Sequence, residues 1–445
     1  MSVKHAVTLD EERCRGCTSC IKSCPAEAIR VRNGKAAILD DRCIDCGKCI
    51  GVCRHRAIRS KADSLDCLSS FDHCVALPEP ALYGQFPQPT DINLVLNALL
   101  ELGFHDVFEV SRAGALLDGY TSHTDLDTDT PMPQISAACP TVLRLIRIRF
   151  PRLIAHVPNT MLPMELAAIL ARREACAKTG LPPERIGVFA IVPCSAKLTI
   201  AHNPEALEHP VIDGALSIRD VCRRLPVAMR ALTERHAALR PLYLPRSLPE
   251  GLPQGGLRCI TADGVENVTR LLEDLEDGRI MDVDFVALSA CARGCFGGCF
   301  TVENPHAAQM RMHCLTDGVP ANASDAMTLN ELAPLLHDVQ PLQYLPSLVL
   351  DEDLAAAMEK QRNIQQLEAH LPGLHCASCG APSCHAFAED VVLGRATEDD
   401  CIFKVRARMR ALDAPGEPDD YLPAPFRRRA AKPEKKSPAH NRPGR

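Results

Sequence analysis

The sequence predicts an α/β core between two small cysteine-rich domains. Three observations lead to this fold class. The chain has 445 residues, of which 46% are hydrophobic, which is enough for about two or three domains with cores of their own. Its 23 cysteines gather mainly in clusters near the two ends. Between the clusters, apolar patterns of helical period alternate with short strand-like runs, as in sheets covered by helices.

No apolar run approaches the roughly 18 residues that a membrane span needs, so we expect no membrane partner. The first residues lack the apolar segment and cleavage site of a secretory signal. We therefore expect a cytoplasmic protein, in which clustered cysteines are interpreted as metal ligands before disulfides.

The first cysteine system contains two copies of the spacing C-x2-C-x2-C-x3-C, which is typical of bacterial ferredoxins. In this pattern the fourth cysteine of each copy binds the cluster of the other copy. A zinc site would explain four cysteines but not this duplicated eight. The sequence therefore predicts an α+β ferredoxin-like domain over residues 1–62 with two 4Fe–4S clusters, one bound by Cys14, Cys17, Cys20 and Cys53, the other by Cys43, Cys46, Cys49 and Cys24.

The middle of the chain, residues 75–345, is predicted to hold the α/β core. A helix is expected over 91–103, with Thr90 as its N-cap and Gly103 at its end, followed by a short strand over 106–110. Two more amphipathic helices are expected to begin at Pro163 and Val265.

Three predicted strands of this core end at a cysteine: Cys139, Cys194 and Cys291, with Cys295 one helical turn later. Ligands of open α/β sheets bind beyond the carboxyl ends of the strands, so these thiols could form one four-cysteine site. The alternative is that each is an ordinary buried cysteine. The glycines within residues 291–299 favour the site, because they let the backbone approach a bulky cofactor.

The second clustered system lies near the C-terminus and contains Cys376, Cys379, Cys384 and Cys401. A helix ending at Gly394 is expected to return the chain to the fourth cysteine. This segment, residues 371–410, resembles the small, mostly helical single-cluster 4Fe–4S domain of corrinoid iron–sulfur proteins and electron-transport complexes. Zinc is the alternative metal, with His375 and His385 nearby.

Two further segments complete the domain prediction. Residues 352–370 are expected to form a linker helix. Residues 411–445 are expected to be a disordered basic tail, whose last 19 residues carry a net charge of +7 against −13 for the remainder of the chain. We do not expect this tail to bind nucleic acid.

The core cysteines lie in motifs that resemble those of the catalytic domain of iron-only, or FeFe, hydrogenases. That family carries Thr-Ser-Cys-Cys-Pro, Met-Pro-Cys-x-x-Lys and Met-x-Cys-x-x-x-Cys; this chain has Ile-Ser-Ala-Ala-Cys-Pro, Ile-Val-Pro-Cys-Ser-Ala-Lys and Leu-Ser-Ala-Cys-Ala-Arg-Gly-Cys. The resemblance extends to about residue 410, and the order of modules is similar to that of the family's sensory branch. It implies two parallel-sheet lobes around a buried cluster.

The resemblance also implies roles for individual residues. Cys139, Cys194, Cys291 and Cys295 would hold the 4Fe–4S part of the hydrogenase H-cluster, and Cys295 would bridge to a two-iron subcluster carrying CO and cyanide. Lys197 would face a cyanide, and this favours the two-iron subcluster, because a plain 4Fe–4S cluster would give the ammonium group no evident partner. The implied cofactors are three 4Fe–4S clusters plus an H-cluster.

The chain departs from the family motifs where catalytic members move protons. Ala138 replaces a proton-relaying cysteine, and an alanine methyl cannot carry a proton. Other altered positions of the family pattern are Val192, Ser289, Ile200 and Leu162. We therefore expect slow or absent hydrogen turnover and a role in sensing H2 or redox state, with H2 as a ligand and a ferredoxin or a signalling protein as partner.

Two alternatives stay open. The core could hold only a 4Fe–4S cluster in a non-enzymatic protein of electron transfer or cluster assembly, or the chain could be a subunit of a larger redox complex. Seven cysteines have no assigned role, of which Cys299 is closest in sequence to the proposed site: Cys67, Cys74, Cys176, Cys222, Cys259, Cys299 and Cys314.

Overall fold

The computed structural model describes residues 5–86, 92–123, 130–136, 138–232, 258–316, 329–336, 339–347 and 349–411. The predicted N-cap Thr90 and the basic tail beyond residue 411 lie outside these residues. Among the described residues, no helix has the length and apolar character needed to cross a membrane.

The N-terminal domain is built from two similar halves. β1 (Val7–Leu9) pairs antiparallel with β4 (Ile58–Ser60), and β2 (Ile29–Arg32) with β3 (Lys35–Ile38). The short helices α1 (Ser19–Ser23) and α2 (Lys48–Val52) start after Thr18 and Gly47, both with positive φ. The left-handed residue turns each loop of cysteines sharply into its helix, so the duplicated sequence gives duplicated structure.

The first lobe of the core contains a parallel four-stranded sheet in the order β6-β5-β8-β9. Its strands are β5 (His73–Pro78), β6 (Asp106–Val107), β8 (Ile186–Val192) and β9 (Gly214–Ser217). Every residue of β5 and β8 is buried, because helices cover both faces of the sheet.

The helices of this lobe divide between the two faces. α4 (Val110–His123) and α6 (Pro163–Thr179) pack on one face, and α3 (Ile92–Glu101) and α8 (Ile218–Ala231) on the other, with the 3-10 helix η2 (Pro80–Gln85). The predicted strand over 106–110 ends early, since the chain enters α4 at Val110.

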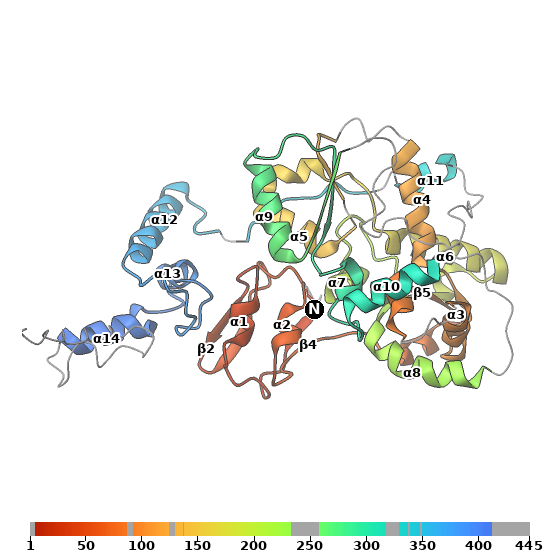
Figure 1. Ribbon diagram of the computed structural model, residues 1–445, viewed down its shortest axis with the longest axis horizontal. Helices are drawn as coiled ribbons and strands as arrows, with labels where there is room; N and C mark the ends of the chain where they lie inside the picture. Colours follow the sequence, from red (N-terminus) through yellow and green to blue (C-terminus); the bar gives the residue numbers. More distant parts are fainter. Residues whose placement is uncertain are drawn as a thin grey trace, which may run out of the picture.

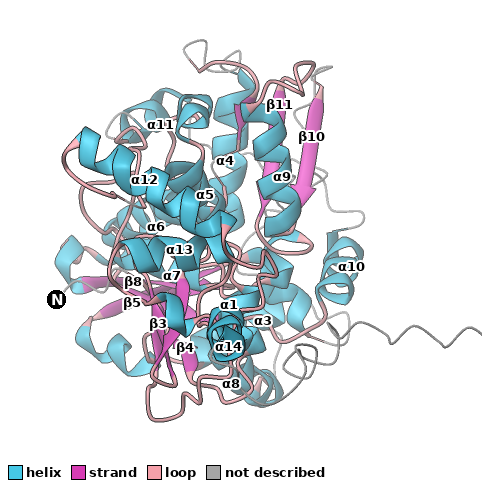
Figure 2. Cartoon of the chain, turned by 90° about the vertical axis from the view of Figure 1, so that its left-hand side faces the viewer, coloured by secondary structure: helices cyan, strands magenta, loops and turns pink. Residues whose placement is uncertain are grey.

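The second lobe contains a parallel three-stranded sheet in the order β10-β11-β7, with β7 (Gln134–Ile135), β10 (Cys259–Asp263) and β11 (Phe285–Ser289). It carries α5 (Pro140–Arg149), η3 (Pro151–His156) and α9 (Val265–Glu276). Figure 2 shows this sheet apart from the β5–β8 sheet. One buried apolar core contains residues of both lobes.

The remaining elements connect the lobes or form the C-terminal module, which we define as residues 349–411. The connecting elements are η1 (Leu65–Ser70), η4 (Pro183–Arg185), α7 (Ser195–His202), η5 (Gly294–Gly297), α10 (Pro305–Thr316) and α11 (Leu329–Leu336). The module contains α12 (Leu354–Ala369), α13 (Cys384–Val392), η6 (Glu398–Asp400) and α14 (Ile402–Ala411) around a small core of its own.

The fold class is confirmed: an α/β core of parallel sheets, a ferredoxin-like N-terminal region and a helical C-terminal region. In Figure 1 the N-terminal domain (red) lies between the lobes and the C-terminal module (blue). The domain boundaries proposed from the sequence remain predictions.

Candidate metal centre

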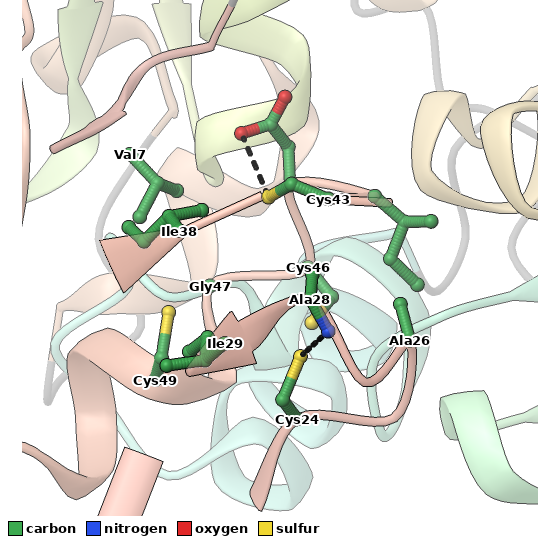
Figure 3. A pocket seen from close by; sticks show the side chains of 12 residues that line it. Val7, Cys24, Ala26, Ala28, Ile29, Ile38, Cys43, Cys46, Gly47 and Cys49 are labelled. Carbon is green, nitrogen blue, oxygen red and sulfur yellow. Dashed lines mark hydrogen bonds between the residues drawn. The ribbon is translucent and has the colours of Figure 1, made fainter. Parts of the chain in front are cut away.

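The four cysteines assigned to the second N-terminal cluster line one hollow. Cys24, Cys43, Cys46 and Cys49 surround it together with apolar side chains such as Ile29 (Figure 3). Burial raises the pKa of the Cys46 thiol to about 12, so a free thiol there keeps its proton. An iron cluster would reverse this, because a coordinating thiol is deprotonated by the metal.

The first N-terminal set is arranged in the same way. Burial raises the pKa of Cys20 to about 11, with further contributions from Cys17 and Cys14. The backbone N–H of Ala57 donates to Cys53 Sγ over 3.3 Å, as that of Ala28 does to Cys24 Sγ over 3.3 Å. Such N–H groups stabilise thiolate charge, so both sets fit an anionic cluster.

The C-terminal set also surrounds one hollow, lined by Cys376, Cys379, Cys384 and Cys401. The neighbouring histidines have protein partners. The Nδ1 atom of His375 accepts the backbone N–H of Cys384 over 3.0 Å, and that of His385 lies 2.7 Å from a carboxylate oxygen of Glu368. His375 also lines this hollow, but its Nδ1 atom is taken by the Cys384 backbone, and the four thiols beside it suit a 4Fe–4S cluster.

The central site brings together cysteines from both lobes. Cys194 follows β8 of the first lobe and caps α7, whereas Cys139 and Cys291 follow β7 and β11 of the second lobe, and Cys295 lies in η5. Burial raises the pKa values of Cys194 and Cys291, and nearby thiols raise them further, among them Cys295 for both residues and Cys139 for Cys291. The four predicted ligands thus come from elements of both lobes at the seam between the two sheets.

The Lys197 side chain lies beside this group. Its Nζ atom donates to Glu79 Oε1 over 2.5 Å, and both side chains are buried, with exposed fractions of 6% and 3%. Burial lowers the pKa of Lys197, but Cys295 and Glu79 together outweigh it and hold that pKa above its usual value. Lys197 therefore has a partner in Glu79 whether or not a two-iron subcluster is present.

The sequence analysis did not identify Glu79 as a site residue, although its position in the sequence could have indicated this role. It is the first residue after the buried strand β5, at the carboxyl edge where parallel strands bind ligands. A second buried acid, Glu109, accepts a hydrogen bond of 2.8 Å from the Tyr83 hydroxyl in the same region.

Replacing Glu109 with glutamine should flatten the pH dependence of stability. Burial raises the pKa of Glu109 to about 7, against the smaller opposing effects of Tyr83 and Arg112, whereas an unfolded glutamate titrates near 4.3. Ionisation of the folded form therefore costs stability as pH rises from about 4.3 to 7. The cost is about 4 kcal/mol at about 1.4 kcal/mol per pKa unit.

Anaerobic denaturation of wild type and Glu109→Gln between pH 5 and 8 measures this difference. The exposed Glu101→Gln is the control and should keep the wild-type slope. An unchanged slope in Glu109→Gln would mean that Glu109 is ionised at no cost.

The positions that depart from the hydrogenase motifs are mostly packed with apolar atoms. Leu162, Val192 and Ile200 are buried in the core that joins the lobes, while Ser289 ends β11 and Ala138 is exposed. Four of these five side chains have no exchangeable proton, and Ser289 carries only a hydroxyl, so none of them is a carboxylic acid, thiol or imidazole that could act as a general acid or base.

Cys299 lies between the central site and the second N-terminal hollow. Its Sγ atom is 3.6 Å from Ser195 Oγ, and the Ser195 hydroxyl donates to the carbonyl oxygen of Asp45 over 2.7 Å. A Cβ at Gly47 would overlap the Cys299 side chain. The N-terminal domain thus docks directly against the start of α7.

The other unassigned cysteines differ in exposure. Cys74 is buried, Cys67 and Cys314 are exposed, and Cys176, Cys222 and Cys259 are half-buried.

Three family models match the chain. Residues 72–235 match the iron-only hydrogenase large subunit, C-terminal domain; residues 6–54 match the 4Fe-4S dicluster domain; and residues 371–403 match an Fe–S cluster family. The third match covers Cys376, Cys379, Cys384 and Cys401, and the second covers the eight N-terminal cysteines.

Curated relatives include the periplasmic [Fe] hydrogenase large subunit of Nitratidesulfovibrio vulgaris, 28% identical over 49% of this chain and 56% of the relative. The NADP-reducing hydrogenase subunit HndD of Solidesulfovibrio fructosivorans is 27% identical over 28% of this chain and 23% of its own length. The chain thus spans about half the length of the first relative and about a quarter of the length of the second. A solved variant of [FeFe]-hydrogenase HydA1 from Chlamydomonas reinhardtii aligns with a TM-score of 0.49 and 18% identity, covering 65% of this chain and 97% of that one.

The protein is an FeFe-hydrogenase-like iron–sulfur protein with 4Fe–4S domains at both ends. The central domain is thus similar to iron-only hydrogenase large subunits, and both flanking regions are similar to iron–sulfur domains.

Proposed function

We propose that this chain binds three 4Fe–4S clusters and an H-cluster, turns over hydrogen slowly or not at all, and senses H2 or redox state. The observation that carries this proposal is the ammonium group of Lys197, placed between Glu79 and Cys295. An ammonium has three N–H donors, so pairing with Glu79 leaves it able to donate to an anionic ligand beside Cys295.

The residues of this chain would act mainly by holding and screening the cofactor. Cys139, Cys194, Cys291 and Cys295 would hold it, and Glu79 would fix the direction of Lys197. When bound, the H-cluster supplies the interconversion of two protons and two electrons with H2. Ala138 offers no group to deliver those protons, which supports sensing over rapid turnover.

Infrared spectroscopy tests the proposal. Protein produced with the enzymes that build the two-iron subcluster should show CO and cyanide bands, and a Cys295→Ser variant should lose or shift them. Hydrogen evolution should lie far below that of a catalytic relative. Absence of the bands from fully loaded wild-type protein would refute the H-cluster and favour the non-enzymatic alternative, in which only 4Fe–4S clusters are present.

The partner remains part of the proposal. A one-electron carrier such as a ferredoxin would exchange electrons with this chain. A signalling protein would bind it and transmit the signal, because none of the predicted domains of this chain is a signalling output module.

A further inference from the structure

We propose that the C-terminal module is the outer end of a single electron path, which runs from its cluster through both clusters of the N-terminal domain to the central site. This inference rests on the proposed cofactor content. It gives the order in which electrons would pass through the clusters, which the cysteine spacing in the sequence does not reveal.

The first step of the path is a direct contact between the C-terminal hollow and strand β2. The backbone N–H of Val31 donates to the carbonyl oxygen of Gly380 over 2.8 Å, and Arg32 donates to the carbonyl oxygen of Cys379, a predicted cluster ligand. Ala377, from the same loop, is buried in the core of the N-terminal domain with Cys14 and Cys20. The C-terminal cluster loop therefore bonds to strand β2 through its backbone and shares an apolar core with the first N-terminal cysteine loop.

Buried ion pairs hold this contact in one geometry. Asp390 of α13 accepts from Arg30 over 2.7 Å and from Arg32 over 2.8 Å, and Glu389 pairs with Arg42 over 2.9 Å. Asp390 is only 2% exposed. Charge-assisted hydrogen bonds of this kind are directional, and breaking a buried pair leaves an uncompensated charge.

The last step lies on the opposite side of the N-terminal domain. Gly47, next to Cys46 of the second hollow, lies against the Cys299 side chain, which follows Cys295 of the central site by four residues. The Thr199 hydroxyl of α7 also donates to the Asp45 carboxylate over 3.0 Å. The second N-terminal set therefore faces the centre. Cys14 and Cys20 of the first set are buried in the core that contains Ala377 of the C-terminal loop, and Cys24 and Cys49 of the second set pack against the edge of that core.

The outer end is accessible to a donor. Ile402 lines the C-terminal hollow and is 40% exposed, and Leu374, which precedes the lining residue His375 in the sequence, is 42% exposed. Figure 1 shows the module on the far side of the N-terminal domain from the lobes. A one-electron carrier protein would reduce the C-terminal cluster and be oxidised by one electron. Each cluster is then reoxidised as it reduces the next, and no proton moves until the central site.

The test compares two glycine variants of the same module. A Cβ at Gly380 would overlap the Val31 carbonyl oxygen, whereas a Cβ at Gly373 would meet nothing within 4 Å; both glycines have positive φ, 79° and 66°. Gly380→Ala and Gly373→Ala thus carry comparable backbone strain, and only the first disturbs the contact. Asp390→Asn, which removes charge without changing shape, is the second variant should Gly380→Ala fail to fold.

Electron paramagnetic resonance of the anaerobically reduced full-length protein gives the first readout. Wild type and Gly373→Ala should show broadened spectra from magnetic coupling between the C-terminal and N-terminal clusters. Gly380→Ala or Asp390→Asn should show an isolated C-terminal signal at unchanged iron content. Stopped-flow reduction by a reduced bacterial ferredoxin is the second readout, and these variants should lose the fast phase of reduction beyond the C-terminal cluster.

Wild-type coupling and a retained fast phase in both contact variants would overturn the proposed path. Absent CO and cyanide bands with intact coupling would refute only the H-cluster, so the two failures are distinguishable.

Discussion

An Ala138→Cys variant should evolve hydrogen roughly 100-fold faster than the wild type, because a positioned general acid or base typically contributes 10²–10⁴-fold. Ala138 precedes the predicted ligand Cys139, and its side chain is exposed, so a thiol fits there without displacing core atoms. Hydrogen evolution by the fully loaded protein, with a chemical electron donor in excess, measures the change.

Ala138→Val controls for side-chain size, since it adds volume but no exchangeable proton, and it should remain as slow as the wild type. Infrared spectra of both variants establish that the cofactor is intact. If Ala138→Cys keeps its bands and gains no activity, proton delivery is limited instead at Val192, Ser289 or Leu162.

Replacing Lys197 with methionine should cost about 3–5 kcal/mol of stability, the usual cost of leaving one member of a buried ion pair uncompensated. Glu79 would remain at 3% exposure with its ionic partner removed. The double variant Lys197→Met/Glu79→Gln removes both charges and should recover most of the loss. Anaerobic denaturation of the single and double variants measures the coupling between the two residues.

Infrared bands separate the stabilising role of this pair from its role at the cofactor. The cyanide bands should shift in every variant that lacks Lys197, including the stabilised double variant. Equal stability of the single and double variants would contradict the coupled pair, and unshifted cyanide bands would contradict the contact with the cofactor.

The sequence predicted the parts of this molecule that depend on local spacing. Ligands such as Cys376 and Cys379 lie within one loop, so their spacing largely determines their geometry. The helices beginning at Pro163 and Val265 also match α6 and α9. The central thiols could be grouped because each follows a predicted strand, although they come from two sheets, and only two residues of the strand before Cys139 are paired as β7.

Features set by distant contacts could not be predicted in this way. The partner of Lys197 is Glu79, 118 residues away in the sequence, and no local pattern links them. No local pattern links Arg30 with Asp390 either. Nor does the sequence show that a side chain at Gly380 would overlap the Val31 carbonyl oxygen. These contacts depend on how folded domains meet, which hydrophobic periodicity does not encode.

The docking of the C-terminal module onto β2 has a consequence for biosynthesis. Arg30 and Asp390 are 360 residues apart, and synthesis at roughly 5–20 residues per second separates their emergence from the ribosome by about 20–70 s. During that interval the N-terminal domain can fold and receive its clusters while the face of β2 that binds Gly380 is still open. Docking of the C-terminal module onto β2 is therefore a late event in synthesis, which comes after the N-terminal domain has had time to fold.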